Sequence, residues 1–357
     1  MQIESWVFRE AGKEMQREQR TELPQPGQVV VEVAGCGVCH TDLGFFYDGV
    51  PTRHPLPLTL GHEVSGRVVE AGEGAESWMG KGVIVPAVIP CGECDACRAG
   101  RGSICPTQIF PGNDVHGGFA SHLTVPAHGL CEVPDLTDPA NNPEGLDLAT
   151  LSVIADAVST PYQAIRRSNL APADLAVFVG AGGVGGFGVQ MAAAMDAHVI
   201  AIDVDDSKLE TLKEYGAHLV LNSANVDFRS LKKAVKGFAK EHGIPSWRWR
   251  IFETSGHPEG QATAFGLMGH GSYLSIVGYT PAKTTVRLSN LMALDATAEG
   301  NWGCLPELYP EVLDMVLKGR VKLAPFTERR PLSSINETFA DVHAHRIARR
   351  PILTPES

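Results

Sequence analysis

The sequence predicts a two-domain α/β protein in which a β-rich domain precedes a domain built on a doubly wound parallel sheet. With 357 residues, the chain is about twice as long as a typical single domain. Short β-branched runs between Gly and Pro turns extend to about residue 150. Beyond them, strand and helix patterns alternate, which is typical of βαβ units.

The individual elements follow from this patterning. In the first region, Val and Ile runs predict strands at residues 28–35, 66–72, 82–90 and 120–126. In the second region, five strands are predicted, at residues 175–181, 198–205, 218–222, 250–256 and 271–279. Helical patterns lie between them at residues 188–197, 208–216, 227–243 and 261–269. From Cys304 onward the pattern changes again, and we expect this tail to return to the first domain.

Composition excludes several classes of protein. Hydrophobic residues make up 43% of the chain and charged residues 20%, as in an ordinary globular protein. The formal net charge of -11 gives no global positive field, so we expect no nucleic-acid partner. No apolar run approaches the roughly 20 residues of a membrane span. The N-terminus lacks the features of a signal peptide, and we therefore expect a cytoplasmic protein without a membrane partner.

Four cysteines are concentrated in the segment CGECDACRAGRGSIC. Their spacing is C-x2-C-x2-C-x7-C, formed by Cys91, Cys94, Cys97 and Cys105. Four thiolates on one loop can surround Zn²⁺ completely, which is typical of a structural site. Buried thiols, a disulfide pair or an iron–sulfur cluster are the alternatives, but a cytoplasmic location disfavours the disulfide.

A second metal site is predicted from two clusters in the β-rich region, GCGVCHTD and GHEVSG. Cys39 and His62 supply a thiolate and an imidazole, and each has an acidic neighbour, Asp42 and Glu63, suited to orienting a ligand. A catalytic zinc needs three protein ligands and one exchangeable position. The alternative is a buried cysteine with an unrelated histidine.

The segment VFVGAGGVGG predicts a dinucleotide-binding loop, because it follows an apolar strand and begins an Ala-rich helix. Without side chains, the backbone can approach a pyrophosphate at the N-terminal amides of the helix. Asp203 ends the next strand, where an acid accepts ribose hydroxyls and repels a 2′-phosphate, so NAD is favoured over NADP. Lys208 is a further candidate for a ribose contact. The predicted cofactor-binding positions in the loop are Gly180, Gly182, Gly183, Val184 and Gly185.

These three features, in this order, resemble the zinc-dependent medium-chain alcohol dehydrogenases over essentially the whole chain. The resemblance implies a GroES-like catalytic domain at residues 1–158, completed by 304–357, and a Rossmann NAD-binding domain at 159–303. It also implies two Zn²⁺ per chain, one structural and one catalytic. The family takes a third catalytic ligand from the segment before the domain crossing, which here places Asp156 in that position. Glu63 is an alternative ligand.

The resemblance also implies roles for residues near Cys39. Thr41 matches the hydroxyl that accepts the alcohol proton, and His40 matches a contact to the cofactor pyrophosphate. Many relatives complete the proton relay with a histidine where this chain has Gly44. Homodimers or homotetramers are implied as well.

A narrower resemblance concerns the substrate. The segments GCGVCHTDLGFFYDGV, RLSNLMALDATAEGNWGCLPELYP and ARRPILTPES are similar to a branch of the family that oxidises a ring secondary alcohol of an acyl-CoA in aromatic compound degradation. The alternatives are a dehydrogenase of another secondary alcohol, an enoyl-thioester reductase, a metal-free quinone reductase of the same superfamily, or a zinc-ribbon nucleic-acid module. The net negative charge disfavours the last of these.

Overall fold

The computed structural model describes residues 1–356, and the chain divides into two compact units. Unit 1 comprises Met1–Ser159, Gly303–Gly319 and the residues from Leu323 onward, and unit 2 comprises Thr160–Trp302 and Arg320–Lys322. The sequence-based domain bounds, 1–158 with 304–357 and 159–303, stay a prediction, and in the structure Arg320–Lys322 group with unit 2. Within unit 2, the side chain of Gln190 donates to the Lys322 carbonyl at 3.2 Å and accepts from its amide at 2.7 Å.

Unit 1 is built on two β-sheets. A three-stranded sheet has the order β2-β1-β4, and a larger sheet has the order β15-β16-β3-β5-β6-β8, with β7 also paired to β3. The strands of unit 1 are β1 (Gln2–Phe8), β2 (Gln16–Thr21), β3 (Gln28–Gly37), β4 (Leu58–Thr59), β5 (Glu63–Ala71), β6 (Gly82–Val85), β7 (His122–Pro126), β8 (Cys131–Val133), β15 (Thr327–Pro331) and β16 (Arg350–Thr354).

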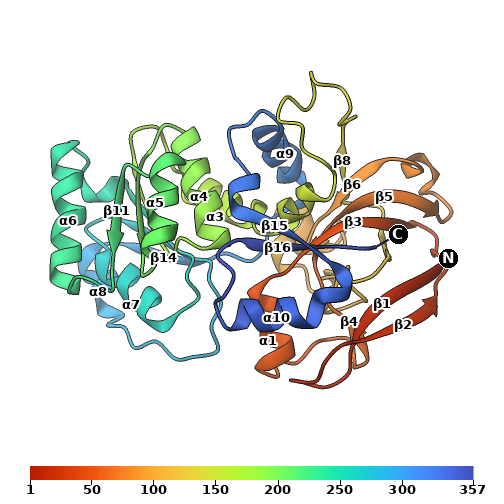
Figure 1. The fold of residues 1–357 in the computed structure, drawn as a ribbon. Helices are drawn as coiled ribbons and strands as arrows, with labels where there is room; N and C mark the ends of the chain where they lie inside the picture. The colour runs from red at the N-terminus through yellow and green to blue at the C-terminus, as the bar shows by residue number, and fades with distance from the viewer. Residues whose placement is uncertain (357) are drawn as a thin grey trace. The chain divides into compact units, whose positions relative to one another are not determined.

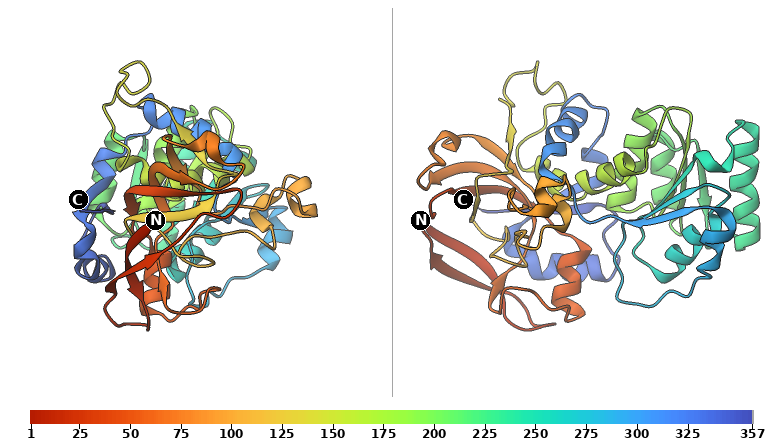
Figure 2. Two further views of the ribbon diagram at one scale, coloured as in Figure 1. Left: turned by 90° about the vertical axis from the view of Figure 1, so that its right-hand side faces the viewer. Right: turned by 180° about the vertical axis from the view of Figure 1, so that it is seen from behind.

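The C-terminal segment completes the larger sheet of unit 1. β16 pairs antiparallel with the end of β3, where Leu353 lies opposite Cys36 and Ile352 opposite Gly37. Figure 1 shows β16, in dark blue, beside β3, and in the right-hand view of Figure 2 the two chain ends lie on the same side of the molecule. Residues far apart in the sequence therefore meet at the end of β3, close to Cys39.

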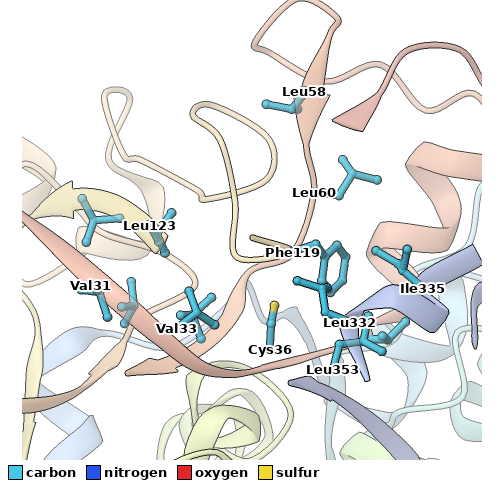
Figure 3. Close-up of a cluster of buried hydrophobic side chains, with 14 of the residues drawn as sticks. Val31, Val33, Cys36, Leu58, Leu60, Phe119, Leu123, Leu332, Ile335 and Leu353 are labelled. Atoms are coloured by element: carbon cyan, nitrogen blue, oxygen red, sulfur yellow. The ribbon is translucent and has the colours of Figure 1, made fainter. Parts of the chain in front are cut away.

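The core of unit 1 joins side chains from the sheets to the C-terminal helix. Figure 3 shows Val33 and Cys36 of β3 near Phe119 and near Leu332, Ile335 and Leu353 of the tail. The ring of Phe119 also packs edge-on against that of Phe339, with centroids 5.6 Å apart. These side chains are all buried, and the hydrophobic effect thus fixes the tail to the sheet.

Unit 2 contains a six-stranded sheet of order β11-β10-β9-β12-β13-β14, in which every pair is parallel. The chain moves outward from β9 to β11 and returns to β12, so the strand order reverses between β9 and β12. This confirms the predicted doubly wound α/β fold. The strands are β9 (Leu175–Val179), β10 (His198–Asp203), β11 (Leu219–Asn222), β12 (Trp249–Glu253), β13 (Tyr273–Ile276) and β14 (Thr297–Gly300).

Helices connect the strands of both units. The α-helices are α1 (His40–Tyr47), α2 (Asp95–Arg98), α3 (Ser159–Arg167), α4 (Gly183–Ala194), α5 (Asp206–Glu214), α6 (Phe228–Glu241), α7 (Pro258–Leu267), α8 (Ser289–Leu294), α9 (Tyr309–Leu317) and α10 (Ile335–His343). The 3₁₀-helices are η1 (Glu76–Trp78), η2 (Gly102–Ile104), η3 (Thr150–Ala155), η4 (Ser246–Arg248), η5 (Pro306–Leu308), η6 (Ala324–Phe326) and η7 (Leu332–Ser334). Within residues 1–356, none of the helices has the length and apolar character needed to cross a bilayer.

We predict that unit 1 loses stability in mild acid because of His116. Burial, together with the charge of Arg20, lowers the pKa of His116 to about 4, and its Nδ1 accepts a bond from Thr59 N at 3.1 Å. Since the pKa of an unfolded histidine is about 6.5, the unfolded chain binds more protons between these values. Stability should therefore fall as the pH decreases from about 6.5 to about 4.

The measurement is the thermal midpoint of the wild type and of His116→Gln across this pH range. The variant, which lacks the titrating ring, should lose less stability. Equal losses in the two proteins would contradict the prediction.

Candidate functional site

The start of helix α1 positions the first predicted metal ligand. Cys39 is the N-cap of α1, and its amide donates to Asp42 Oδ2 at 3.0 Å. Asp42 Oδ1 accepts a second bond from Gly61 N at 3.2 Å. Asp42 is fully buried, so its carboxylate holds the segments that carry Cys39 and His62 close together.

His62 immediately precedes β5 and is 1% exposed. Neither of its ring nitrogens makes a hydrogen bond of regular geometry with any residue from 1 to 356. Asp42 Oδ1 lies 3.3 Å from Nδ1, and Asp156 Oδ2 lies 3.5 Å from Nε2. A buried imidazole in these surroundings suits a metal ligand, with Asp42 orienting Nδ1 and with Nε2 facing the ion.

Asp156 completes a cluster of ligand atoms within unit 1. It follows η3 directly, and its Oδ2 lies 3.7 Å from Cys39 Sγ as well as 3.5 Å from His62 Nε2. A tetrahedral zinc ion with bonds of about 2.0–2.3 Å separates its ligands by about 3.3–3.8 Å. The spacing of these three side chains therefore fits a zinc ion.

Glu63 is the fourth member of the cluster, in which one ligand atom from each residue lies within 4.8 Å of the others. Both of its oxygens contact the guanidinium of Arg350, with Oε2 at 2.7 Å from Nε and Oε1 paired to Nη2. Oε1 also accepts from Ala157 N at 3.0 Å. Glu63 is therefore held by β16 and by the residue after Asp156.

Arg350 is a site residue that the sequence reasoning missed. Its side chain is buried, and its partner Glu63 lies 287 positions earlier in the chain. The available signal was a charged residue beginning the otherwise apolar run RPILT, which predicts a buried partner for the charge.

The pKa values in the cluster reflect an excess of negative charge. Burial alone would lower the pKa of His62, but the carboxylates of Asp42 and Asp156 outweigh it and raise the pKa well above the ordinary value. Burial raises the pKa of Glu63 to about 7, with Asp156 acting in the same direction and Arg350 opposing both. A divalent cation would offset this charge.

Two further features surround the cluster. Thr41 lies in the first turn of α1, with its Oγ1 3.7 Å from Cys39 Sγ, while His40 is exposed at the start of the same helix. The ring of Phe110 lies 4.8 Å from that of His62, and Phe110 belongs to a small buried cluster with Ala87 and Val88. The metal-ligand atoms therefore have an apolar neighbourhood on one side.

The predicted cysteine loop brings its four sulfur atoms together. Sγ separations are 3.9 Å for Cys91 and Cys97, 3.5 Å for Cys94 and Cys97, and 3.8 Å for Cys94 and Cys105. With Zn–S bonds of about 2.3 Å, a tetrahedral site requires separations of about 3.8 Å. The Thr107 hydroxyl and nearby backbone amides lower the pKa of Cys91 to about 6, which favours the thiolate that binds metal.

In unit 2, the Gly-rich loop connects β9 to α4. A Cβ added at Gly185 would lie 1.9 Å from the Gly180 carbonyl oxygen, so this helix-to-loop contact requires glycine. At Gly182, the N-cap of α4, an added Cβ would meet no protein atom within 4 Å. Gly183 and Val184 form the first turn of α4. An open N-terminal turn of this kind suits a pyrophosphate.

Asp203 ends β10 beside this loop. Its Oδ2 accepts from Ala181 N at 2.6 Å, and its Oδ1 accepts from Val204 N and Asp205 N at 2.8 and 3.0 Å. Lys208 lies in the first turn of α5, and its amide donates to Asp205. The acid is therefore fixed against the loop that would receive a dinucleotide.

We predict that removing the charge of Arg350 destabilises unit 1. Arg350→Met leaves the buried carboxylate of Glu63 without its cation, which should cost about 3–5 kcal/mol. Urea unfolding, followed by tryptophan fluorescence, measures the loss.

The matched control is Glu63→Gln in the Arg350→Met background, which removes the second charge and should recover part of the stability. A loss well below the range for a buried pair, or no recovery in the double variant, would contradict the prediction.

We also predict different metal losses from two single substitutions. Wild-type protein should contain two zinc ions per chain, since the ligand atoms of each cluster lie within 4.8 Å of one another. Cys97→Ser should lose the ion of the cysteine loop, and Asp156→Ala should lose the ion near His62 after brief treatment with a chelator. Elemental analysis after gel filtration measures the zinc content, and two ions retained in both variants would count against the assignment.

Comparison with known proteins places these features in a family. A model described as alcohol dehydrogenase GroES-like domain matches residues 25–135, and one described as zinc-binding dehydrogenase matches residues 183–318. An alcohol dehydrogenase of Geobacillus stearothermophilus is 29% identical over 343 residues, covering 95% of each chain. An alcohol dehydrogenase of a Moraxella species is 28% identical over 352 residues, covering 97% of this chain and 98% of the relative.

Solved structures agree with these matches. The acetophenone reductase of Geotrichum candidum, determined in complex with NAD, has a TM-score of 0.84 and 25% identity, covering 99% of this chain and 97% of that protein. Zinc, expected from the sequence, is confirmed by the two metal-ligand clusters together with the match to the zinc-binding dehydrogenase model. This protein is an oxidoreductase that belongs to the zinc-dependent medium-chain alcohol dehydrogenase family.

Proposed function

We propose that this protein is a 6-hydroxycyclohex-1-ene-1-carbonyl-CoA dehydrogenase. It oxidises the ring secondary alcohol of this acyl-CoA to the 6-oxo compound, with NAD as the acceptor, in anaerobic benzoyl-CoA degradation. The observation that supports the reaction class most strongly is the close approach of the ligand atoms of Cys39, His62 and Asp156 next to an apolar cluster. The narrower substrate rests on the resemblance of three sequence segments.

Cys39, His62 and Asp156 hold the catalytic ion in this proposal. The anionic ligands, Cys39 and Asp156, balance the charge of the ion. Asp42 orients His62, and the ion pair between Glu63 and Arg350 lies next to the ligand cluster. Zinc supplies a Lewis acid for the alcohol oxygen, and the nicotinamide supplies the hydride acceptor. Phe110, packed on the His62 ring, excludes water from one side of the ligand atoms.

Thr41 is the proposed proton acceptor for the substrate alcohol. Its hydroxyl lies 3.7 Å from Cys39 Sγ, close enough to the ligand cluster to contact an alcohol bound there. Gly44 offers no side chain to continue the relay, so the proton needs water or another group to reach the solvent from Thr41. His40 is the proposed pyrophosphate contact.

The choice of NAD over NADP follows from Asp203. Its carboxylate is fixed beside the Gly-rich loop by three backbone amides and presents negative charge where a 2′-phosphate would lie. The proposed loop contacts come from Gly180, Gly182, Gly183, Val184 and Gly185, with Lys208 near the ribose. A cytoplasmic homodimer or homotetramer stays a prediction.

The decisive experiment follows NADH formation with the ring hydroxyacyl-CoA and with matched free cyclic alcohols. We expect turnover of the thioester and little turnover of the free alcohols. Activity on free alcohols alone would remove the CoA proposal, and NADH-dependent reduction of an enoyl-CoA would reassign the reaction.

Thr41→Val and Thr41→Ser provide matched variants for the same assay. Loss of the hydroxyl in Thr41→Val should lower kcat by about 10²–10⁴-fold while zinc content is unchanged, and Thr41→Ser should retain most activity. Equal activity of the two variants would remove Thr41 from the proton path.

A further inference from the structure

Glu253 is a buried acid that neither the metal cluster nor the Gly-rich loop uses directly. It is the last residue of β12, it is 0% exposed, and it lies opposite Val179, the last residue of β9. The strand order of unit 2 reverses between these two strands. In doubly wound sheets, ligands bind at the carboxyl ends of the strands where the order reverses. Glu253 therefore lies at the carboxyl ends of the strands, where a cofactor is expected to bind.

One oxygen of Glu253 organises the turn that follows β12. Oε1 accepts from Ser255 N at 2.8 Å, from Gly256 N at 3.1 Å and from Ser255 Oγ at 2.5 Å. Oε2 is buried and makes no hydrogen bond with residues 1–356. Burial raises the pKa of Glu253, although the Ser255 and Gly256 donors oppose this shift. The carboxyl group thus accepts the hydrogen bonds that these three donors of one turn would otherwise make with water.

This turn packs directly on the Gly-rich loop. A Cβ added at Gly180 would lie 2.4 Å from Ser255 N and 2.6 Å from Ser255 Cα. The Thr254 hydroxyl donates to the Gly180 carbonyl at 2.8 Å. The path of the Gly-rich loop between β9 and α4 therefore depends on where Ser255 lies.

The residues after β13 also contact Glu253 and the turn that follows β12. Gly278 N donates to the backbone carbonyl of Glu253 at 3.0 Å. A Cβ added at Gly278 would lie 2.2 Å from Gly256 N and 2.9 Å from Glu253 Oε2. Three loops, after β9, β12 and β13, are thus in contact around one carboxyl group.

We propose that Glu253 is a positioning residue for the nicotinamide cofactor, acting through Ser255 and Gly256 on the Gly-rich loop. Its carboxyl group fixes the turn after β12, and this turn holds Gly180 where the loop amides can receive a pyrophosphate. Fixing these loops before the cofactor arrives lowers the ordering cost of binding. The role depends on the cofactor and not on the substrate alcohol.

The test measures the Kd for NADH of the zinc-loaded protein by fluorescence titration, together with the thermal midpoint. Glu253→Ala leaves three donors without an acceptor, so it should weaken NADH binding by about tenfold or more. Glu253→Gln keeps one carbonyl oxygen for the same donors and should retain most of the affinity. Affinity unchanged in Glu253→Ala would overturn the proposal.

Asp174→Asn is the matched control for a merely structural effect. Asp174 is also a buried carboxylate of unit 2, but it directly precedes β9, at the amino ends of the strands. It accepts hydrogen bonds from the side chain of Arg248 and from Ala171 N. This variant should lower the thermal midpoint without changing the Kd for NADH. A loss of affinity as large as that of Glu253→Ala would show that general destabilisation is the cause and would overturn the proposal.

Ser255→Ala keeps the proposal testable if Glu253→Ala does not fold. It removes one bond to Glu253 Oε1 and should weaken NADH binding measurably, whereas a wild-type Kd would overturn the proposal. Because no substrate is present in these titrations, failure of the proposed acyl-CoA activity would leave their outcome unaffected.

Discussion

Negative charge inside the β-rich unit is the constraint on which the active-site architecture depends. Asp42 and Glu63 are fully buried, and Cys39 and Asp156 would add anionic groups if they bound a metal. Unneutralised charges in such a medium cost several kcal/mol each. Arg350 supplies one positive charge and zinc supplies two more, while the amides bonded to Asp42 stabilise its carboxylate. The β16 strand and the N-cap of α1 thus belong to the metal site as much as its ligands do.

Prediction from the sequence succeeded where the relevant residues are close together in the chain. The spacing of the cysteine loop, the glycines after β9 and the alternation of strands with helices are all local patterns, and the predicted fold class and zinc are confirmed. Arg350 could not be placed in this way. Its partner lies 287 positions away, and only the pairing of β16 with β3 brings the two together. A charged residue in an apolar run indicates that a partner exists, but not which one.

In unit 2 as well, the sequence predicts the features that are local in the chain and not the contacts between distant segments. A glycine pattern indicates a turn near a helix N-terminus, and an acid after the next strand indicates a ribose contact. Neither pattern reveals that the turn after β12 must lie against Gly180, because that contact crosses between neighbouring parallel strands. Parallel strands are separated in sequence by a helix, and the loops that meet at their ends are therefore distant in sequence although adjacent in space.

The pairing of β16 with β3 also has a consequence for biosynthesis. A ribosome makes the chain from its N-terminus, so Glu63 is synthesised long before the guanidinium that compensates it. Throughout that interval the nascent β-rich unit contains a carboxylate that cannot be buried cheaply. The pairing of Glu63 with Arg350 can form only after β16 has been synthesised, by which time every strand of the unit 2 sheet has already been made.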